Sequence, residues 1–316
     1  MIPSVAHFIW YGPHFWWVNA LAIRSAAARG GFERVVLHHD HDLSGTPAFE
    51  ELRRLETFEA RRLAPRALFE RLGALGGPLT ELHDQLKKPN ARANMVRAAI
   101  LATEGGVYLD TDTITVKSLD ALRSAPAFCG RERVVFPVEL LRDKRVSRIL
   151  KSWSLMAVRE ACRQMPQGWR WFRRIESWYP TAVNNAVVGS IPGHPLMLQL
   201  VQAMVDLPAA RRHVPYALGT HLLQDRVALY DGRDLVVHPP SVFFPLGPEI
   251  SHHWFRFRAG PQPAEILADD THVVHWYASV RTKNIAPHID EAYVRAHASR
   301  QLFSALALPV INGSPQ

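Results

Sequence analysis

The sequence predicts an α/β fold in which strands and helices alternate through one large domain spanning residues 1–316. Short apolar runs typical of buried strands recur between longer segments of helical character, with Gly and Pro residues separating them. At 47% hydrophobic and 21% charged residues, the chain has the composition of an ordinary globular protein with a sizeable core. In such folds ligands bind at the carboxyl ends of strands, so polar side chains there are the first candidates for function.

The expected elements alternate in order along the chain. Extended segments are predicted at residues 5–10, 34–37, 107–109, 114–116, 186–188, 235–237 and 273–276. Helices are predicted at about 15–28, 91–103 and 194–204, with a mostly helical stretch broken by Pro and Gly at 46–86. Gly105 and Gly106 form a typical C-terminal stop for the helix at 91–103. The strand at 107–109 therefore begins directly after a helix.

Positive charge is concentrated in one segment. Residues 131–174 hold twelve Lys or Arg and four Asp or Glu, so this segment alone carries a net charge equal to the +8 of the whole chain. The same region, a largely helical basic insert over about 131–180, contains the aromatic residues Trp153, Trp169, Trp171, Phe172 and Trp178. Basic residues mixed with Trp suit an anionic membrane surface or an acidic acceptor. The alternative is a solvated helical pair whose Trp residues anchor the core, and no recognised motif supports nucleic-acid binding.

Cysteine content and hydropathy bear on location. Cys129 and Cys162 give no disulfide framework and suit a reducing compartment. The two charge-free stretches, 1–23 and 177–205, are interrupted by Pro, Gly and Asn, and the first lacks a basic start. The expectation is a cytoplasmic protein without a membrane-spanning segment, able to sit peripherally at the inner membrane face.

Two carboxylates follow the predicted strand at 107–109. Asp110 and Asp112 are one residue apart, and side chains at i and i+2 of extended backbone point the same way. They can therefore converge on a hard divalent cation, Mn²⁺ or Mg²⁺, that leaves positions open for phosphate oxygens. A cation held between carboxylates and a diphosphate is what activation of a nucleotide-sugar requires. A solvated turn at the strand end is the alternative, because Asp and Thr are common there.

Four segments in the same order resemble the DXD-type glycosyltransferases of family 32, which are related to the glucosylating toxin domains of clostridia. The segments are residues 2–12 (IPSVAHFIWYG), residues 93–97 with 105–112 (ANMVR and GGVYLDTD), residues 185–189 with 192–195 (NAVVG and PGHP), and residues 275–279 (HWYAS). The resemblance extends over most of the chain, with these segments as its anchors. The resemblance implies a GT-A fold, Rossmann-like and nucleotide-sugar-binding, and transfer of a hexose with retention of configuration. It implies a UDP-sugar donor in preference to a GDP-sugar, and a glycan, lipid-linked or protein acceptor.

The resemblance also assigns roles to residues. Asp110, Asp112 and Arg97 are the implied catalytic residues, and Asp110, Asp112 and His275 the implied metal ligands. The implied donor-binding residues are Trp10, Asn94, Arg97, Tyr108, Asp110, Asn185 and Ser279. The residue chemistry agrees, because an indole at a strand end can stack on a base. Asn94 and Arg97, three apart on a helix, share a face on which Arg97 could bind hydroxyls or phosphate. A core Trp10 and a packing contact by Arg97 are the alternatives.

The chain departs from the family pattern at two positions. Ala93-Asn94 stands where the family has Ser-Asp, so an amide replaces a carboxylate and sugar recognition can differ. Val280 replaces the final Trp, which puts a contact near the leaving diphosphate in doubt. These departures motivate a second hypothesis, a non-catalytic binder of sugar-nucleotides or carbohydrate. Retention of both Asp residues favours the enzyme.

Overall fold

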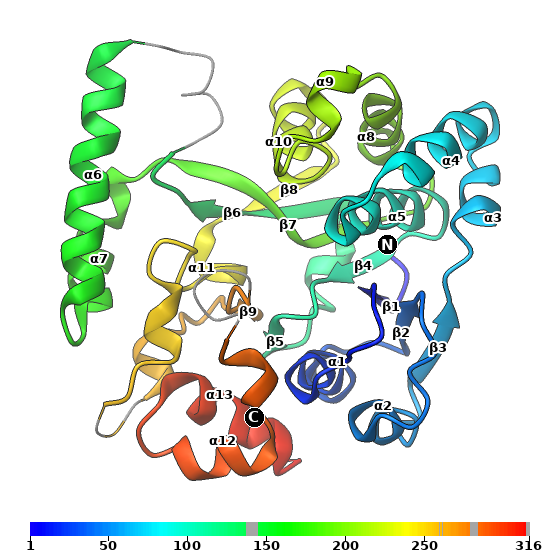
Figure 1. Cartoon of the computed structure of the whole chain (residues 1–316). Helices are drawn as coiled ribbons and strands as arrows, with labels where there is room; N and C mark the ends of the chain where they lie inside the picture. The colour runs from blue at the N-terminus through cyan, green and yellow to red at the C-terminus, as the bar shows by residue number, and fades with distance from the viewer. Residues whose placement is uncertain (137–144, 259, 261, 279–283, 314–316) are drawn as a thin grey trace. The chain divides into compact units, whose positions relative to one another are not determined.

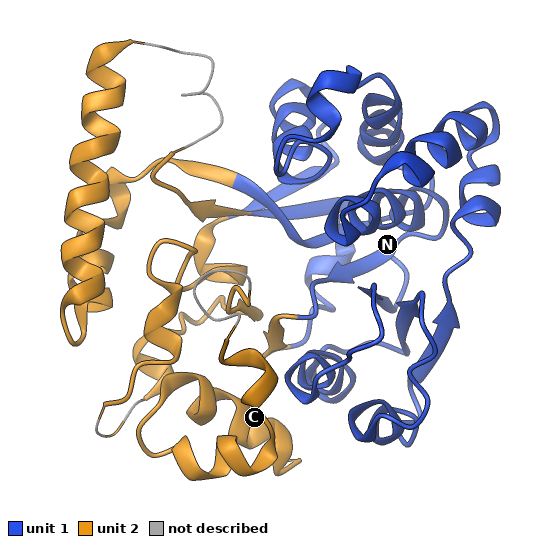
Figure 2. Ribbon diagram, viewed as in Figure 1, with its two compact units in different colours: residues 1–111, 118–130, 183–238 blue, residues 112–117, 131–182, 239–316 orange. Residues whose placement is uncertain are grey.

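The computed structural model describes residues 1–136, 145–258, 260, 262–278 and 284–313. Val280 and the predicted donor-binding residue Ser279 lie outside these residues. The chain divides into two compact units, shown in blue and orange in Figure 2. Unit 1 comprises residues 1–111, 118–130 and 183–238, and unit 2 comprises residues 112–117, 131–182 and 239–316.

A seven-stranded sheet organises unit 1, with the strand order β3-β2-β1-β4-β7-β6-β8 (Figure 1). Its strands are β1 (Val5–Trp10), β2 (Arg34–His39), β3 (Phe58–Arg62), β4 (Gly106–Leu109), β6 (Ala127–Arg133), β7 (Thr181–Ser190) and β8 (Leu235–His238). The pairs β1–β2, β2–β3, β1–β4 and β6–β8 are parallel, and β4–β7 is antiparallel. The order reverses between β1 and β4, and this reversal is where open α/β sheets bind ligands. The predicted α/β class is confirmed.

Unit 1 also contains helices, of which those at residues 17–29 and 89–103 pack on strands of this sheet. The helices of unit 1 are α1 (Trp17–Arg29), α2 (Pro47–Leu52), α3 (Pro65–Glu70), α4 (Gly76–Gln85), α5 (Pro89–Thr103), α8 (Pro195–Val205), α9 (Ala209–Arg212) and α10 (Thr220–Leu229). Helices α5 and α8 contribute much of one apolar core, in which Val96 and Ile100 pack with Leu200 and with Tyr108 of β4. Proline at the first turn favours the start of α5 and of α8, because its missing N–H has no helical partner there. Strand β4, the central strand of the seven, is thereby packed against α5.

Unit 2 is mainly helical. It contains the two-stranded antiparallel sheet β5 (Thr113–Thr115) and β9 (Val273–His275). Its helices are α6 (Val146–Gln164), α7 (Gly168–Ile175), α11 (Pro240–Phe243), α12 (Glu291–His297) and α13 (Leu302–Ile311). Most of the described part of the basic insert is therefore helical, as the sequence predicted, while its first residues, 131–133, belong to β6. Trp169 is buried, whereas Trp153, Trp171 and Trp178 are exposed, so core anchoring accounts for only one of these four indoles.

Two strands of the large sheet were not predicted. Strand β3 interrupts the stretch expected to be mostly helical, and its sequence Phe-Glu-Ala-Arg-Arg has little apolar character because it lies at the sheet edge. Strand β6 contains Gly130 and three charged residues, and it forms through pairing with β8 and β7. Both cysteines are buried and neither forms a disulfide, and within the described residues no helix is long and apolar enough to cross a membrane.

A buried pair of histidines joins β1 to β2. His7 Nδ1 and His38 Nε2 are 3.0 Å apart, and both side chains are almost fully buried. Burial lowers the pKa of His7 to about 4, and burial together with the neighbouring His7 lowers that of His38. Both rings are therefore neutral at pH 7, one donating to the other.

Gly106 lets β4 begin beside this pair. Its φ of +94° is rarely adopted by L-residues, and a Cβ there would lie 2.8 Å from both His7 Nε2 and the Val5 carbonyl oxygen. We predict that Gly106→Ala lowers the free energy of unfolding by about 2–5 kcal/mol, through backbone strain and steric overlap. Urea denaturation measures the change. Gly77→Ala in α4 is the matched control, because a Cβ there meets nothing within 4 Å and the variant should keep or gain stability. Equal stability of the two variants would contradict the prediction.

Candidate donor and metal site

Trp10 and Asp110 follow neighbouring parallel strands. β1 ends at Trp10, β4 ends at Leu109, and the sheet order reverses between these two strands. Because the carboxyl ends of parallel strands meet at one sheet edge, both residues lie where an α/β sheet binds its ligand. The Trp10 ring is half-buried and contacts Phe15 edge-on at a centroid distance of 5.3 Å. This position is compatible with stacking and also with partial core packing, so the stacking role stays a prediction.

Asp110 is held by a cation and a phenol. Arg97 Nη2 donates to Asp110 Oδ1 at 2.9 Å, and Tyr108 Oη donates to the same oxygen at 2.7 Å. The Arg97 guanidinium also lies 4.0 Å from the centroid of the Tyr108 ring. Tyr108 is buried, and burial raises its pKa, so it remains a neutral donor. Arg97 is 8% exposed, so its charge lies in an environment where the pairing is strong.

Asn94 and Asn185 form the other end of the same network. Asn185 Nδ2 donates to Asn94 Oδ1 at 3.0 Å, and Arg97 Nη1 donates to the Asn185 carbonyl oxygen at 2.8 Å. Thr220 Oγ1 donates to Asn185 Oδ1 at 3.1 Å. A cavity of about 20 Å³ borders Asn94, Arg97, Asn185 and Gly219. Sequence reasoning missed Gly219 and Thr220 because no motif marks them. The predicted residues Asn94, Arg97, Tyr108, Asp110 and Asn185 are thus brought together in unit 1.

Asp112 and His275 form a pair within unit 2. His275 Nε2 lies 2.9 Å from Asp112 Oδ1, and the Ala278 backbone N–H donates to Asp112 Oδ2 at 2.8 Å. Burial by itself would raise the pKa of the Asp112 carboxyl, but attraction to His275 and the hydrogen bonds from His275 and Ala278 lower it overall. Asp112 is therefore ionised at neutral pH, as a metal ligand must be. The antiparallel register of β5 and β9 opposes Thr113 to His275 and so sets the pair.

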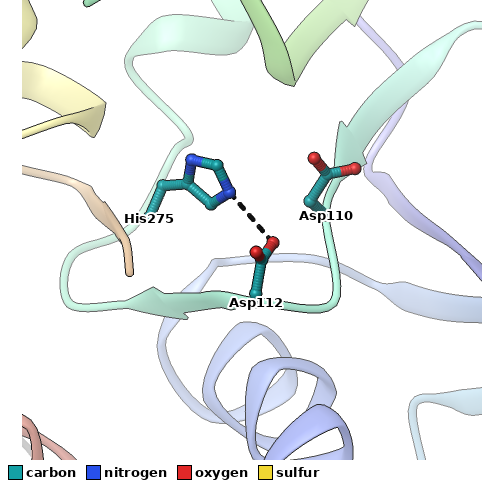
Figure 3. A group of neighbouring side chains, drawn as sticks. All are labelled: Asp110, Asp112 and His275. Carbon is teal, nitrogen blue, oxygen red and sulfur yellow. Dashed lines mark hydrogen bonds and ion pairs between the residues drawn. The ribbon is translucent and has the colours of Figure 1, made fainter. Parts of the chain in front are cut away.

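The three predicted metal ligands are drawn in Figure 3. Only Thr111 separates Asp110 from Asp112, so chain connectivity limits the distance between their Cα atoms to about 7 Å. One ligand atom from each of Asp110, Asp112 and His275 lies within 4.8 Å of the others. Carboxylate oxygens with an imidazole nitrogen suit Mn²⁺ or Mg²⁺, and ligand atoms opposite each other on such an ion are about 4 Å apart. The donor set thus fits the predicted ion.

The backbone of the motif differs from the expectation. The sequence argument placed Asp110 and Asp112 on one face of extended chain, but residues 111 and 112 form a turn between β4 and β5. The i, i+2 pair that does share a face is Tyr108 and Asp110, which hydrogen-bond to each other. Asp112 is directed to His275 by the turn instead. The PGHP segment has a structural part as well, since His194 accepts a hydrogen bond from the Leu196 N–H at the start of α8.

Trp10→Ala tests the stacking role. We expect the affinity for UDP to fall by about 1–3 kcal/mol, the contribution of a base–aromatic stack. Isothermal titration calorimetry measures the change, and Trp10→Phe serves as the control because it keeps an aromatic face. Unchanged affinity of a folded Trp10→Ala variant would remove Trp10 from the donor site.

Comparisons with known proteins point to one family. Residues 35–129 match the family model described as a glycosyltransferase sugar-binding region containing a DXD motif. The matched segment runs from β2 to β6 and includes Arg97, Tyr108, Asp110 and Asp112. No protein in the curated set is similar enough to this sequence to count as a match.

Several solved structures resemble the chain. The PaToxG glycosyltransferase is 16% identical, with 72% of this chain and 69% of that chain covered and a TM-score of 0.45. Mouse xyloside xylosyltransferase 1 is 14% identical, with coverages of 87% and 98% and a TM-score of 0.48. The galactosyltransferase LgtC, in complex with donor and acceptor sugar analogues, is 9% identical, with coverages of 93% and 99% and a TM-score of 0.41. Residues 35–129 are therefore similar to the sugar-binding region of DXD-motif glycosyltransferases, and this match confirms the resemblance that the sequence motifs indicated.

Proposed function

We propose that this protein is a metal-dependent, retaining glycosyltransferase of the GT-A type that uses a nucleotide-sugar, with UDP-sugars favoured over GDP-sugars. The observation that carries the proposal is the DxD motif itself. It directly follows β4 at the point where the strand order reverses, and it presents an Asp110 clamped by Arg97 and an ionised Asp112 paired with His275.

The proposed roles of these residues are to hold the metal ion, to orient one of its ligands and to bind the nucleotide-sugar. Asp112 and His275, with Asp110, would hold Mn²⁺ or Mg²⁺, which supplies Lewis-acid neutralisation of charge on the diphosphate leaving group. Arg97 and Tyr108 fix the orientation of the Asp110 carboxylate, and Trp10 offers a face to the base. Asn94 and Asn185 supply amide groups for sugar hydroxyls, which suits a recognition different from that of relatives with Asp at position 94.

The proposed reaction retains the configuration of the sugar. The bond between the anomeric carbon and the diphosphate oxygen breaks, and an acceptor hydroxyl forms a bond to that carbon on the same face. The leaving phosphate takes the acceptor proton. This route requires no enzyme nucleophile, and the sequence offered no candidate for one. The acceptor is proposed to be a glycan, a lipid-linked intermediate or a protein side chain.

A donor screen tests the proposal. Purified protein is incubated with a panel of UDP- and GDP-sugars, and release of the nucleoside diphosphate is measured with Mn²⁺, with Mg²⁺ and with a chelator. We expect slow release from at least one UDP-sugar that stops on chelation and returns with Mn²⁺, and an α-configured product by NMR from an α-configured donor. Metal-independent release would contradict the metal assignment, and an inverted product would contradict retention.

The alternative is a binder of sugar-nucleotides without turnover. The Asn94 amide, which stands in place of the family's carboxylate, is engaged by Asn185 Nδ2, and this observation favours the alternative. Tight, metal-dependent UDP-sugar binding without release of diphosphate across the whole panel would select the binder over the enzyme.

Helix α6 suggests that an anionic membrane presents the acceptor. Val146, Leu150 and Trp153 are 70%, 63% and 55% exposed and follow i, i+4, i+7 spacing, beside the basic residues Arg148 and Lys151. Exposed apolar residues with flanking cations suit the interface of an anionic bilayer.

Co-sedimentation with phosphatidylserine vesicles tests this contact. We expect pelleting at low salt that falls at least about tenfold in the double variant Arg148→Glu, Lys151→Glu, since each basic residue contributes about 1 kcal/mol. Arg54→Glu, an exposed change in unit 1, is the control and should pellet as the wild type does. Absence of pelleting by the wild type would point to a soluble acceptor.

A further inference from the structure

Unit 2 contains a cavity of about 290 Å³ next to the turn between α6 and α7. The turn contributes Gln164, Gln167 and Trp169, and the segment after the 3₁₀ turn Ser251–Trp254 contributes Arg256 and Arg258. The volume is close to the lower end of the roughly 300–1,000 Å³ of small-molecule sites. None of the residues that line this cavity has yet entered the proposed chemistry.

Trp169 forms a largely buried part of the cavity wall. It is 3% exposed, and its indole N–H is not accessible to solvent. Trp169 therefore contributes ring surface to the lining. The Arg258 guanidinium lies 5.7 Å from the centroid of the Trp169 ring, so a cation and an aromatic ring lie together in the wall.

The charge of the lining is positive. Arg256 Nη1 donates to the carbonyl oxygens of Gln164 and Met165 at 3.2 and 2.9 Å, which fixes the guanidinium at the end of α6. Arg258 Nη2 donates to Glu265 at 3.1 Å, and Glu265 also accepts from Arg170, so this one carboxylate faces two cations. No Asp or Glu is among the described lining residues. An anionic ligand is therefore the electrostatic match.

The remaining lining groups suit a saccharide. Phe257 is 56% exposed and gives the cavity an aromatic surface. His253 Nε2 lies 3.2 Å from the Cys162 carbonyl oxygen and donates to it, which leaves the other ring nitrogen as an acceptor. Burial lowers the pKa of His253 to about 3, so the ring is neutral. Amide donors, an imidazole acceptor and aromatic surface together match the hydroxyls and apolar faces of a sugar ring.

We propose that this cavity binds an acidic sugar unit, bearing a carboxylate or phosphate, of the glycan acceptor. The role of this sugar as part of the acceptor rests on the proposed transferase function, whereas the binding of an acidic sugar does not. The cavity and the Asp112–His275 pair belong to the same unit. Phe255, which lies between two lining residues, packs against Trp276 at a centroid distance of 5.7 Å, and so links the cavity segment to the strand that carries His275.

Calorimetric binding to the full-length protein tests the proposal. The probes are methyl β-D-glucuronide, glucose 6-phosphate, methyl β-D-glucoside and inorganic phosphate. We expect at least one acidic sugar to bind about tenfold or more tightly than the neutral glucoside and than phosphate, since charge-assisted hydrogen bonds contribute that much. The two acidic probes distinguish a carboxylate from a phosphate ligand. Equal binding of the neutral glucoside, equal binding of phosphate, or no binding of either acidic sugar would overturn the proposal.

Variants locate the binding in this cavity. Arg256→Gln and Arg258→Gln each remove one lining charge but keep a donor amide. We expect each to weaken the acidic sugar about tenfold, while Arg174→Gln, an exposed change on the same helix as Trp169, leaves it unchanged. Undiminished binding in both folded cavity variants would overturn the assignment. Release of diphosphate from the donor should persist in all three, so loss of acidic-sugar binding and failure of the transferase function are read separately.

Discussion

Asp112→Asn is expected to reduce metal-dependent release of nucleoside diphosphate by about 10²-fold or more, while the protein remains folded. Lewis-acid stabilisation of a leaving group contributes several kcal/mol, and each 1.4 kcal/mol corresponds to a factor of ten in rate. The asparagine amide can still accept from the Ala278 N–H and donate to a neutral His275, so the local structure loses little. Turnover is measured with the donor identified by the screen, at saturating Mn²⁺.

The control for this variant is Asp269→Asn. Asp269 is an exposed acid in the same unit, outside the motif, and its substitution removes the same charge. It should leave turnover unchanged. If Asp112→Asn turns over donor at the rate of Asp269→Asn, Asp112 does not bind the metal.

Arg97→Lys is expected to lower turnover about 10–100-fold, the usual contribution of a partner that orients a metal or substrate ligand. Lysine retains the charge but has no planar fork, so it cannot bind the Asn185 carbonyl, the Tyr108 hydroxyl and Asp110 together. Arg97→Met would cost about 3 kcal/mol or more of stability, because it leaves the partly buried Asp110 without its cation. Urea denaturation and the turnover assay are run on both variants.

Helix α5 supplies the control for the arginine. Arg92→Lys makes the same exchange earlier on that helix, outside the network around Asp110, and it should leave turnover unchanged. A purely structural role of Arg97 would appear as lost stability with normal turnover in the folded Lys variant. That result would remove Arg97 from the proposed chemistry.

The local sequence pattern was sufficient to predict the strands that position the candidate site. The apolar run Val5–Trp10 and the Gly-Gly pair before β4 predicted both strand ends that bear Trp10 and Asp110. Strand β3 was missed because an edge strand can be short and charged, so its sequence lacks the pattern of a buried strand. The turn at Asp112 was missed because its geometry depends on pairing with a segment more than 150 residues later, which no local pattern encodes.

The hydrogen-bond network around Asp110 was likewise predictable only in part. Arg97 and Asp110 belong to recognisable motifs, but the contact between Asn185 and Thr220 depends on how β7 and α10 pack. The burial of Trp169 could not be predicted either. Four Trp residues lie in the same basic segment and look alike in sequence, although only this one is buried. Residue type predicted which groups could act, and tertiary packing decided which of them meet.

The neutral histidine pair between β1 and β2 makes folding a proton-linked equilibrium. In the unfolded chain His7 takes up a proton near its ordinary pKa of about 6.5, whereas in the folded protein its pKa is about 4. Between these two values the unfolded state binds more protons, so stability is complete above about pH 6.5 and decreases as the pH falls toward 4. His38 shifts in the same direction and adds to the effect. Mild acidification therefore lowers the stability of the fold through two buried side chains of β1 and β2 that have no part in the proposed sugar transfer.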